Sequence, residues 1–176
     1  AVSGKIDRID RHEATGASRG LDYKTSDQPV QPREAHLGAV RRDETPPEFA
    51  RFTAEGREWA WRDLQLPLYL RALAAESALG SQPAPEAMAG AATRPAVAVG
   101  YFNLPKAATE TGIALWDGYT RELDEAAWRC ATGVAAAIRA GEFWPPNENI
   151  RADYDEFASL FHHGAAASVA GKVGTP

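Results

Sequence analysis

Near the start of the chain, hydrophobic and polar positions alternate with a period of two. The alternation covers residues 2–10, with Ile6 on one side and Asp7 on the other. Successive side chains of a strand point to opposite faces, so this pattern predicts a β-strand. A second short run, residues 20–25, follows a turn-like segment, and the two runs together predict a hairpin. Asp7 and Asp22 would then lie on neighbouring strands.

Two longer segments repeat apolar residues at helical spacing. Residues 64–79 predict a helix that has Asp63 as its N-cap and Pro67 in the first turn or at a kink. Residues 123–140 predict a second helix, which Gly141 can close.

The remaining apolar runs complete the expected domain. Residues 96–104 and 112–116 predict strands, and the first run is suited to a buried position. Residues 153–162 predict a short third helix. We therefore expect one domain over residues 1–163 and a flexible tail over 164–176. Its fold class is α/β, with a small mixed β-sheet centred on the hairpin and flanked by α-helices.

Two segments lack such patterning. Residues 26–57 are rich in proline, arginine and acidic residues, and predict a long loop or insertion. Residues 81–94 predict a linker or surface loop. Arginines of the first segment are candidates for phosphate contacts, although neighbouring acidic residues offset their charge. These arginines are Arg33, Arg41, Arg42, Arg51 and Arg57.

For the five tryptophans, core packing is the default interpretation.

Composition limits the classes of function. The chain has 176 residues, of which 44% are hydrophobic and 24% charged, as expected for one globular domain. A net charge of −5 argues against a freestanding, electrostatically driven nucleic-acid binder, so any DNA contact must be local. No apolar run of about 18 residues exists, which predicts no membrane segment.

A single cysteine, Cys130, excludes an internal disulfide and a four-cysteine cluster within the chain. This cysteine usage fits a reducing cytoplasm. The chain starts without an initiator methionine, directly in patterned sequence, so we expect a fragment of a longer polypeptide.

The strongest chemical signal combines Asp7 with Asp22, Tyr23 and Lys24. Phosphodiester hydrolysis needs a hard cation, and hard cations select carboxylate and carbonyl oxygens. Two aspartates on adjacent strands can supply these oxygens, and the backbone carbonyl of Tyr23 can add another. Lys24 shares a strand face with Asp22, where its ammonium can hold water or stabilise negative charge. We expect Asp22 and Lys24 to face a wet cleft. Asp10 extends the charge pattern, but is better interpreted as a surface charge.

The first predicted helix adds Gln65 and Tyr69, four residues apart and so on one face. That face can overlook the hairpin and offer an amide and a phenol to phosphate or to Lys24. The alternative is a polar edge of a core helix.

The motifs Gly4-Lys5-Ile6-Asp7, Asp22-Tyr23-Lys24-Thr25 and Gln65-x-x-x-Tyr69 together resemble the signature of RecB-type nucleases in the PD-(D/E)XK superfamily. The resemblance is close over about the first 70 residues. It implies a restriction-endonuclease-like core and Mg²⁺-dependent, exonuclease-like hydrolysis of DNA phosphodiester bonds, with Mn²⁺ as a plausible substitute. In this resemblance Asp7, Asp22 and the Tyr23 carbonyl bind metal, Lys24 is catalytic, and Gln65 and Tyr69 belong to the active-site helix.

The same resemblance implies a role in recombination and DNA repair, with a helicase module or subunit feeding single-stranded ends to the domain. Residues 141–146 resemble the Gly-x-Phe-x-Pro stretch of the AddB-like branch. Two features depart from that branch. No cysteine cluster follows, so no iron–sulfur centre is expected, and the family's upstream helix is missing before Ala1.

Two alternatives remain open at this stage. The domain is either a nuclease or a catalytically inactive DNA-binding or scaffolding module of a helicase–nuclease complex. A resolvase or restriction-type enzyme on the same core is a third possibility, although the Gln-x-x-x-Tyr helix favours the RecB type.

Overall fold

The computed structural model describes residues 3–42, 45–80 and 97–142. The chain divides into a compact unit from Ala1 to Gly133 and a second unit from Val134 to Pro176. The predictions for residues 81–94, 153–162 and 164–176 lie outside the described residues, as do residues 143–146 of the proline-containing motif.

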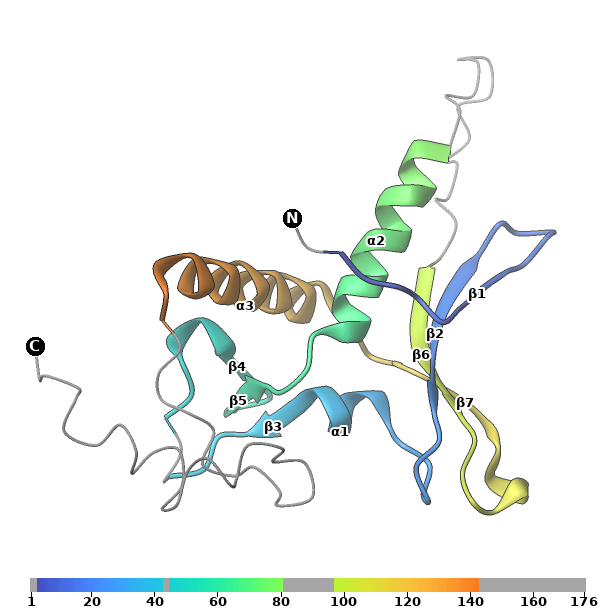
Figure 1. The fold of residues 1–176 in the computed structure, drawn as a ribbon, viewed down its shortest axis with the longest axis horizontal. Coiled ribbons are helices and arrows are strands. Elements are labelled where there is room, and N and C mark those ends of the chain that lie inside the picture. The colour runs from blue at the N-terminus through green and yellow to red at the C-terminus, as the bar shows by residue number, and fades with distance from the viewer. Residues whose placement is uncertain (1–2, 43–44, 81–96, 143–176) are drawn as a thin grey trace, which may run out of the picture. The chain divides into compact units, whose positions relative to one another are not determined.

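The first unit contains a four-stranded mixed sheet (Figure 1). The antiparallel hairpin β1–β2 is confirmed, β2 and β6 pair in parallel, and β6 and β7 pair antiparallel. The strands, in the order of the sheet, are β1 (Arg8–Arg11), β2 (Ser18–Lys24), β6 (Val97–Asn103) and β7 (Gly112–Leu115). The first strand is shorter than predicted, since β1 begins at Arg8. The prediction that Asp7 lies on this strand was therefore wrong, because Asp7 precedes β1 by one residue.

Helix α2 (Gln65–Gly80) lies against β2 and β6, and matches the predicted helix (Figure 1). Gly20 of β2 allows this close approach. A Cβ atom on Gly20 would lie 2.7 Å from Cδ1 of Leu73. The Asp63 carboxylate accepts the Gln65 backbone N–H at 2.7 Å, so the predicted cap is present. Pro67 stands in the first turn as expected.

Residues 26–57 were predicted to form a long loop, and this prediction was wrong. They contain α1 (Pro32–His36), β3 (Leu37–Ala39), a short 3₁₀ helix (Glu48–Ala50) and β4 (Arg51–Ala54). Strands β3 and β4 both pair antiparallel with β5 (Arg57–Trp61), which gives a second, three-stranded sheet.

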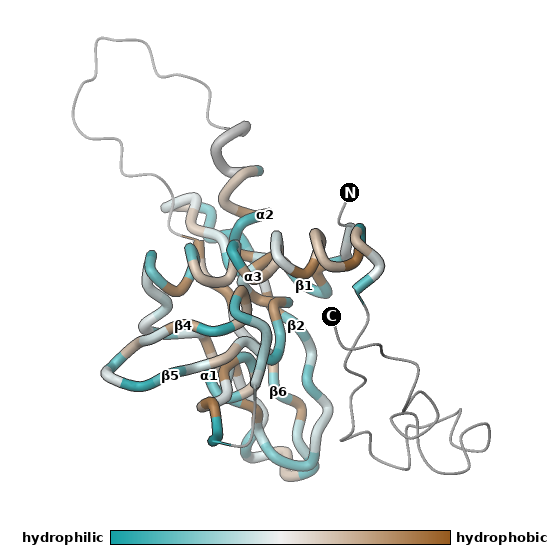
Figure 2. Tube along the Cα trace, turned by 90° about the vertical axis from the view of Figure 1, so that its left-hand side faces the viewer, coloured by the Kyte–Doolittle hydropathy of each residue, from teal (hydrophilic) through white to brown (hydrophobic). Residues whose placement is uncertain are grey.

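A two-residue turn joins β4 to β5. Glu55 and Gly56 both have positive φ, 54° and 72°, as the common two-residue hairpin turn requires. The start of β5 beyond this turn is hydrophilic (Figure 2), and Arg57 and Glu58 are exposed.

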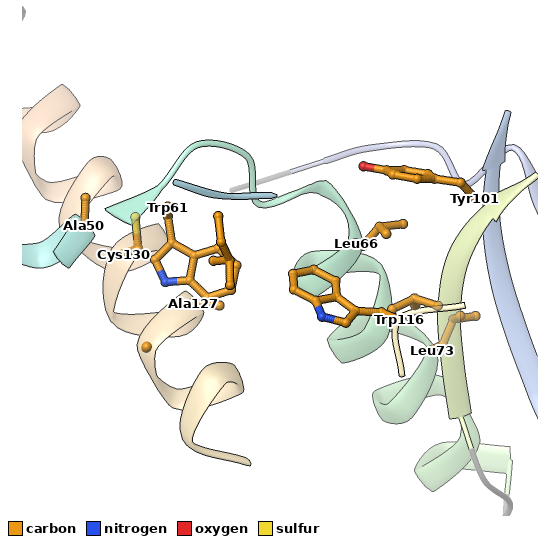
Figure 3. Close-up of a cluster of buried hydrophobic side chains, with 11 residues drawn as sticks. Ala50, Trp61, Leu66, Leu73, Tyr101, Trp116, Ala127 and Cys130 are labelled. Atoms are coloured by element: carbon orange, nitrogen blue, oxygen red, sulfur yellow. The ribbon is translucent and has the colours of Figure 1, made fainter. Parts of the chain in front are cut away.

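The hydrophobic core joins the two sheets to α2 and to the first part of α3 (Arg121–Ala140). Trp61 and Trp116 lie near its centre, with ring centroids 6.2 Å apart (Figure 3). Leu66 and Leu73 contribute from α2. The default core interpretation is confirmed for Trp61 and Trp116, but Trp128 is 48% exposed, with the Arg71 guanidinium over its ring.

Helix α3 ends in the second unit, where Gly141 adopts a φ of 74°. The N–H of Glu142 donates to the Ala137 carbonyl at 2.9 Å, and the N–H of Gly141 donates to the Ile138 carbonyl at 3.2 Å. This pattern satisfies the last helical carbonyls, so the predicted glycine terminator is confirmed. Among the described helices, none has the length and apolar character needed to cross a bilayer.

Candidate active site

Asp22 and Lys24 lie on one face of β2, toward its carboxyl end. Lys24 Nζ is 2.7 Å from Asp22 Oδ2. Tyr101 is the register partner of Asp22 on β6, and its ring centroid is 4.6 Å from Lys24 Nζ. The ammonium is therefore held between a carboxylate and the face of an aromatic ring, which both favour its charge.

The amide of Gln65 ties helix α2 to this pair. Its Nε2 donates to Asp22 Oδ1 at 2.8 Å and to the Tyr69 hydroxyl at 3.2 Å. Its Oε1 accepts a long hydrogen bond of 3.5 Å from Lys24 Nζ. The expected placement of Gln65 over the hairpin is thus what the structure shows.

Tyr69 connects the same helix to the segment before β1. Its hydroxyl donates to the Lys5 carbonyl at 2.6 Å, two residues before Asp7. Burial, the largest cause, raises the pKa of Tyr69, so the phenol stays protonated and able to donate. Gln65 and Tyr69 therefore tie α2 to Asp22 and to the segment before β1.

Asp7 lies beside the Tyr23 peptide. Its Oδ2 accepts the Tyr23 backbone N–H at 3.2 Å. The Tyr23 side chain is exposed and contacts Phe102, at 5.5 Å between ring centroids. The contact between Tyr23 and Asp7 is thus made by the Tyr23 backbone.

Asp22 is less exposed than predicted. We expected a wet cleft, yet Asp22 is only 6% exposed, whereas Lys24 is partly exposed. The reason is that Gln65 and Lys24 occupy both carboxylate oxygens and cover the side chain. A buried carboxylate needs such partners, because burial without them costs several kcal/mol.

Asp10 belongs to a separate surface network. Arg8 Nε lies 2.7 Å and Arg19 Nε 2.9 Å from its two carboxylate oxygens. Hydrogen bonds from Arg8 and then Arg19 lower the pKa of Asp10. This arrangement agrees with the interpretation of Asp10 as a surface charge.

Two of the arginines named as candidates for phosphate contact are paired with acidic residues. Arg33 lies 2.8 Å from Glu55, and Arg51 lies 3.3 Å from Glu58.

The oxygen atoms around Asp22 are of the kind that a hard cation selects. Asp7 and Asp22 carry carboxylates and the Tyr23 peptide carries a carbonyl, and these are the oxygen types that bind a small divalent ion. Within the described part of the chain, no three His, Cys, Asp or Glu side chains gather as a metal site. A cation here would therefore rely on two carboxylates and a backbone oxygen.

Three contributors to the site were not predicted. They are the Lys5 carbonyl, the ring of Tyr101, and His36. Tyr101 lies in an apolar run, and its position became visible only when β6 was paired with β2. No local pattern in the sequence distinguishes His36.

Comparison with known proteins gives the class. The model of the PD-(D/E)XK nuclease superfamily matches residues 1–157, and the chain belongs to this superfamily. The mixed sheet flanked by helices is consistent with its restriction-endonuclease-like fold. Membership supports nuclease activity, typically with a divalent metal and a DNA substrate. Searches of curated proteins and of solved structures gave no match.

Proposed function

We propose that this protein is a Mg²⁺-dependent deoxyribonuclease of the RecB type. The observation that carries the proposal is the network in which Gln65 and Lys24 hold the two oxygens of Asp22, while Tyr69 holds the segment that leads to Asp7. Strand β2 and helix α2 thus meet at the Asp22 carboxylate, and Tyr69 ties α2 to a third part of the chain, the segment before β1. We infer that 1–163 acts as one nuclease domain, a reading supported by the family match to residue 157.

In this proposal Asp7, Asp22 and the Tyr23 carbonyl hold Mg²⁺, or Mn²⁺ in its place. The cation would supply positive charge that neutralises the phosphate and favours ionisation of water. No iron–sulfur centre takes part. The Asp7 hydrogen bond to the Tyr23 N–H keeps one carboxylate beside the backbone carbonyl that shares its role.

Lys24 acts on the reacting atoms. Its partly exposed ammonium can orient the attacking water and stabilise the negative charge that develops on the phosphate oxygens. Contacts to Asp22, Gln65 and Tyr101 fix its position before substrate arrives. Such fixed charges lower the barrier because they need little rearrangement during the reaction.

We place the activity in recombination and DNA repair, on single-stranded ends delivered by a helicase module or subunit, in the cytoplasm. The acidic charge of −5 supports a delivered substrate, because the domain has little long-range attraction for DNA.

The test compares the protein with Lys24→Ala and Asp22→Asn on single-stranded DNA, with Mg²⁺ and then with EDTA. Lys24→Ala should lower cleavage by at least about 100-fold while Mn²⁺ and DNA binding persist. Asp22→Asn should lose both cleavage and Mn²⁺ affinity, since it removes a charged ligand. Lys106→Ala is the matched control, because Lys106 is exposed on the loop after β6. Wild-type cleavage that survives EDTA, or a fully active Lys24→Ala variant, would refute the assignment.

One observation favours a second function, a catalytically inactive DNA-binding or scaffolding module. Lys24 and Asp22 already form an ion pair with each other. In the described residues, only the two carboxylates of Asp7 and Asp22 are proposed as ligands of a cation. A wild-type protein that binds DNA but never cleaves it with Mg²⁺ or Mn²⁺ would establish this alternative.

A further inference from the structure

His36 is a fully buried polar side chain at the end of α1, outside the set of residues discussed so far as catalytic. It is 0% exposed. Its ring lies 5.8 Å from the Tyr101 ring and 4.9 Å from the Trp116 ring, centroid to centroid. Tyr101 in turn lies under the Lys24 ammonium. The imidazole is therefore one aromatic ring away from the proposed catalytic lysine.

Both ring nitrogens have partners. The Leu66 backbone N–H donates to Nε2 at 3.2 Å, which requires Nε2 to be unprotonated. The proton then resides on Nδ1, which lies 2.9 Å from the Pro32 carbonyl and 3.1 Å from the Tyr101 hydroxyl. This tautomer satisfies both the donor of Leu66 and the acceptor of Pro32.

The Leu66 contact completes the first turn of α2. Helix starts leave backbone N–H groups without helical partners. Here Asp63 takes that of Gln65, Pro67 has none, and the N–H of Leu68 reaches the Leu64 carbonyl. His36 takes the remaining one, directly after Gln65 in the sequence.

We propose that His36 is a positioning residue: through the Leu66 N–H it fixes the first turn of α2, and so holds the Gln65 amide on Asp22 and Lys24. The inference rests on the proposed function for its catalytic consequence. The hydrogen bond from Gln65 Nε2 to Asp22 Oδ1 is directional, so a small rotation of this turn removes it. Loss of it leaves an oxygen of a buried carboxylate without a partner and lets Lys24 shift.

The surroundings keep the imidazole neutral, as this contact demands. Burial is the main cause that lowers the pKa of His36, and the charge of Lys24 adds to it. Asp63, the Pro32 carbonyl and Asp22 act in the opposite direction without reversing the shift. A protonated ring would point Nε2–H at the Leu66 N–H and break the contact.

Two substitutions separate the ring nitrogens. His36→Gln places an amide oxygen near the position of Nε2 and keeps an acceptor for the Leu66 N–H. His36→Asn reaches only the position of Nδ1 and keeps a donor for the Pro32 carbonyl. Each variant loses the contacts of one ring nitrogen and buried ring volume, so both should be destabilised, as thermal melts will show.

The expected results differ between the two variants. His36→Asn should lower kcat by about tenfold or more with little change in KM, because misplacement of catalytic groups costs rate. His36→Gln should keep most of kcat. In NMR spectra of the metal-free protein, the Leu66 amide should exchange with solvent faster in His36→Asn than in His36→Gln. The side-chain amide signals of Gln65 should shift only in His36→Asn.

These readouts distinguish the two proposals. Equal kcat in the two variants would overturn the positioning role. So would a loss of kcat that is fully explained by the loss of thermal stability in each variant. Should the wild-type protein not cleave DNA at all, the proposed function fails. The NMR comparison then decides alone: protection of Leu66 and an unshifted Gln65 in His36→Gln support the role, and equal behaviour of the variants overturns it.

Discussion

The Asp22 carboxylate is both buried and fully engaged. Its oxygens contact Gln65 Nε2 and Lys24 Nζ, at 2.8 and 2.7 Å. A cation that binds Asp22 must therefore share the carboxylate with these two donors.

The hydroxyl of Tyr69 offers a direct test at the level of one atom. Tyr69→Phe removes the 2.6 Å hydrogen bond to the Lys5 carbonyl. Urea denaturation should show a loss of about 1 kcal/mol in the free energy of unfolding. Cleavage should also slow, because the segment leading to Asp7 loses its tie to α2.

Tyr119→Phe is the control for this test. The Tyr119 hydroxyl donates to Asp124 of α3 at 3.4 Å, and the partner of Asp124 is Arg71 rather than a residue of the candidate site. This variant should leave the cleavage rate close to that of the wild type. A Tyr69→Phe variant with a wild-type rate would remove Tyr69 from the site.

His36 should make stability depend on pH. Its pKa is lowered from 6.5 in the folded state, chiefly by burial. Above about pH 7 both states are neutral and the group has no effect. As the pH falls below 6.5, the unfolded chain takes up the proton first, so stability declines by up to about 1.4 kcal/mol per pH unit. Urea denaturation at pH values from 7.5 to 5 should show this decline in the free energy of unfolding in the wild type and not in His36→Gln. Parallel curves for the two proteins would contradict it.

Among the elements, α2 was predictable because its signals are local. Asp63 caps it, Pro67 fits its first turn, and its apolar stripe repeats at helical spacing. The same holds for the hairpin that carries Asp22. Apart from Asp7, which precedes β1, the candidate site residues lie on these elements, so their approximate placement also followed from the sequence.

The second sheet could not be predicted in the same way. Strand β3 has three residues and β4 has four, too short for a period of two to stand out. A usable signal was Glu55-Gly56, a two-residue turn before the alternating segment that contains Trp59 and Trp61. The burial of Asp22 and the role of His36 depend on contacts between distant segments, which no local pattern contains.

Strand β7, the antiparallel neighbour of β6, leaves no space at Gly100. A Cβ atom there would meet the Ala114 carbonyl oxygen and lie 2.8 Å from the Leu115 Cα, both backbone atoms of β7. Gly100→Ala should therefore destabilise the protein by about 1–3 kcal/mol, measured by thermal or urea denaturation. Gly112→Ala is its match on β7, with nothing within 4 Å of the new atom. Similar stabilities for the two variants would show that β6 and β7 can separate at little cost.

For the molecule as a whole, the charge of −5 and the pairing of Arg33 and Arg51 with Glu55 and Glu58 limit attraction to DNA. Binding should therefore depend on few phosphate contacts and on the divalent cation. A partner that delivers DNA would compensate for this weakness, which agrees with the proposed helicase module.

Metal content gives a whole-molecule prediction. The single cysteine, Cys130, is buried and burial raises the pKa of its thiol, so it is a poor ligand for iron. Protein purified without oxygen should be colourless and contain neither iron nor acid-labile sulfide in stoichiometric amounts. A visible absorption band near 400 nm that is lost in Cys130→Ser would contradict this expectation.

The parallel pairing of β2 with β6 also determines when the site can form during translation. The hairpin β1–β2 can close as soon as its residues have left the ribosome, but Ser18 must wait for Val97, and Asp22 for Tyr101. Pairing between such distant segments is a slow step in folding. Until it occurs, Lys24 lacks the ring beneath it, so a nascent chain has the nuclease motifs without the geometry to cut DNA.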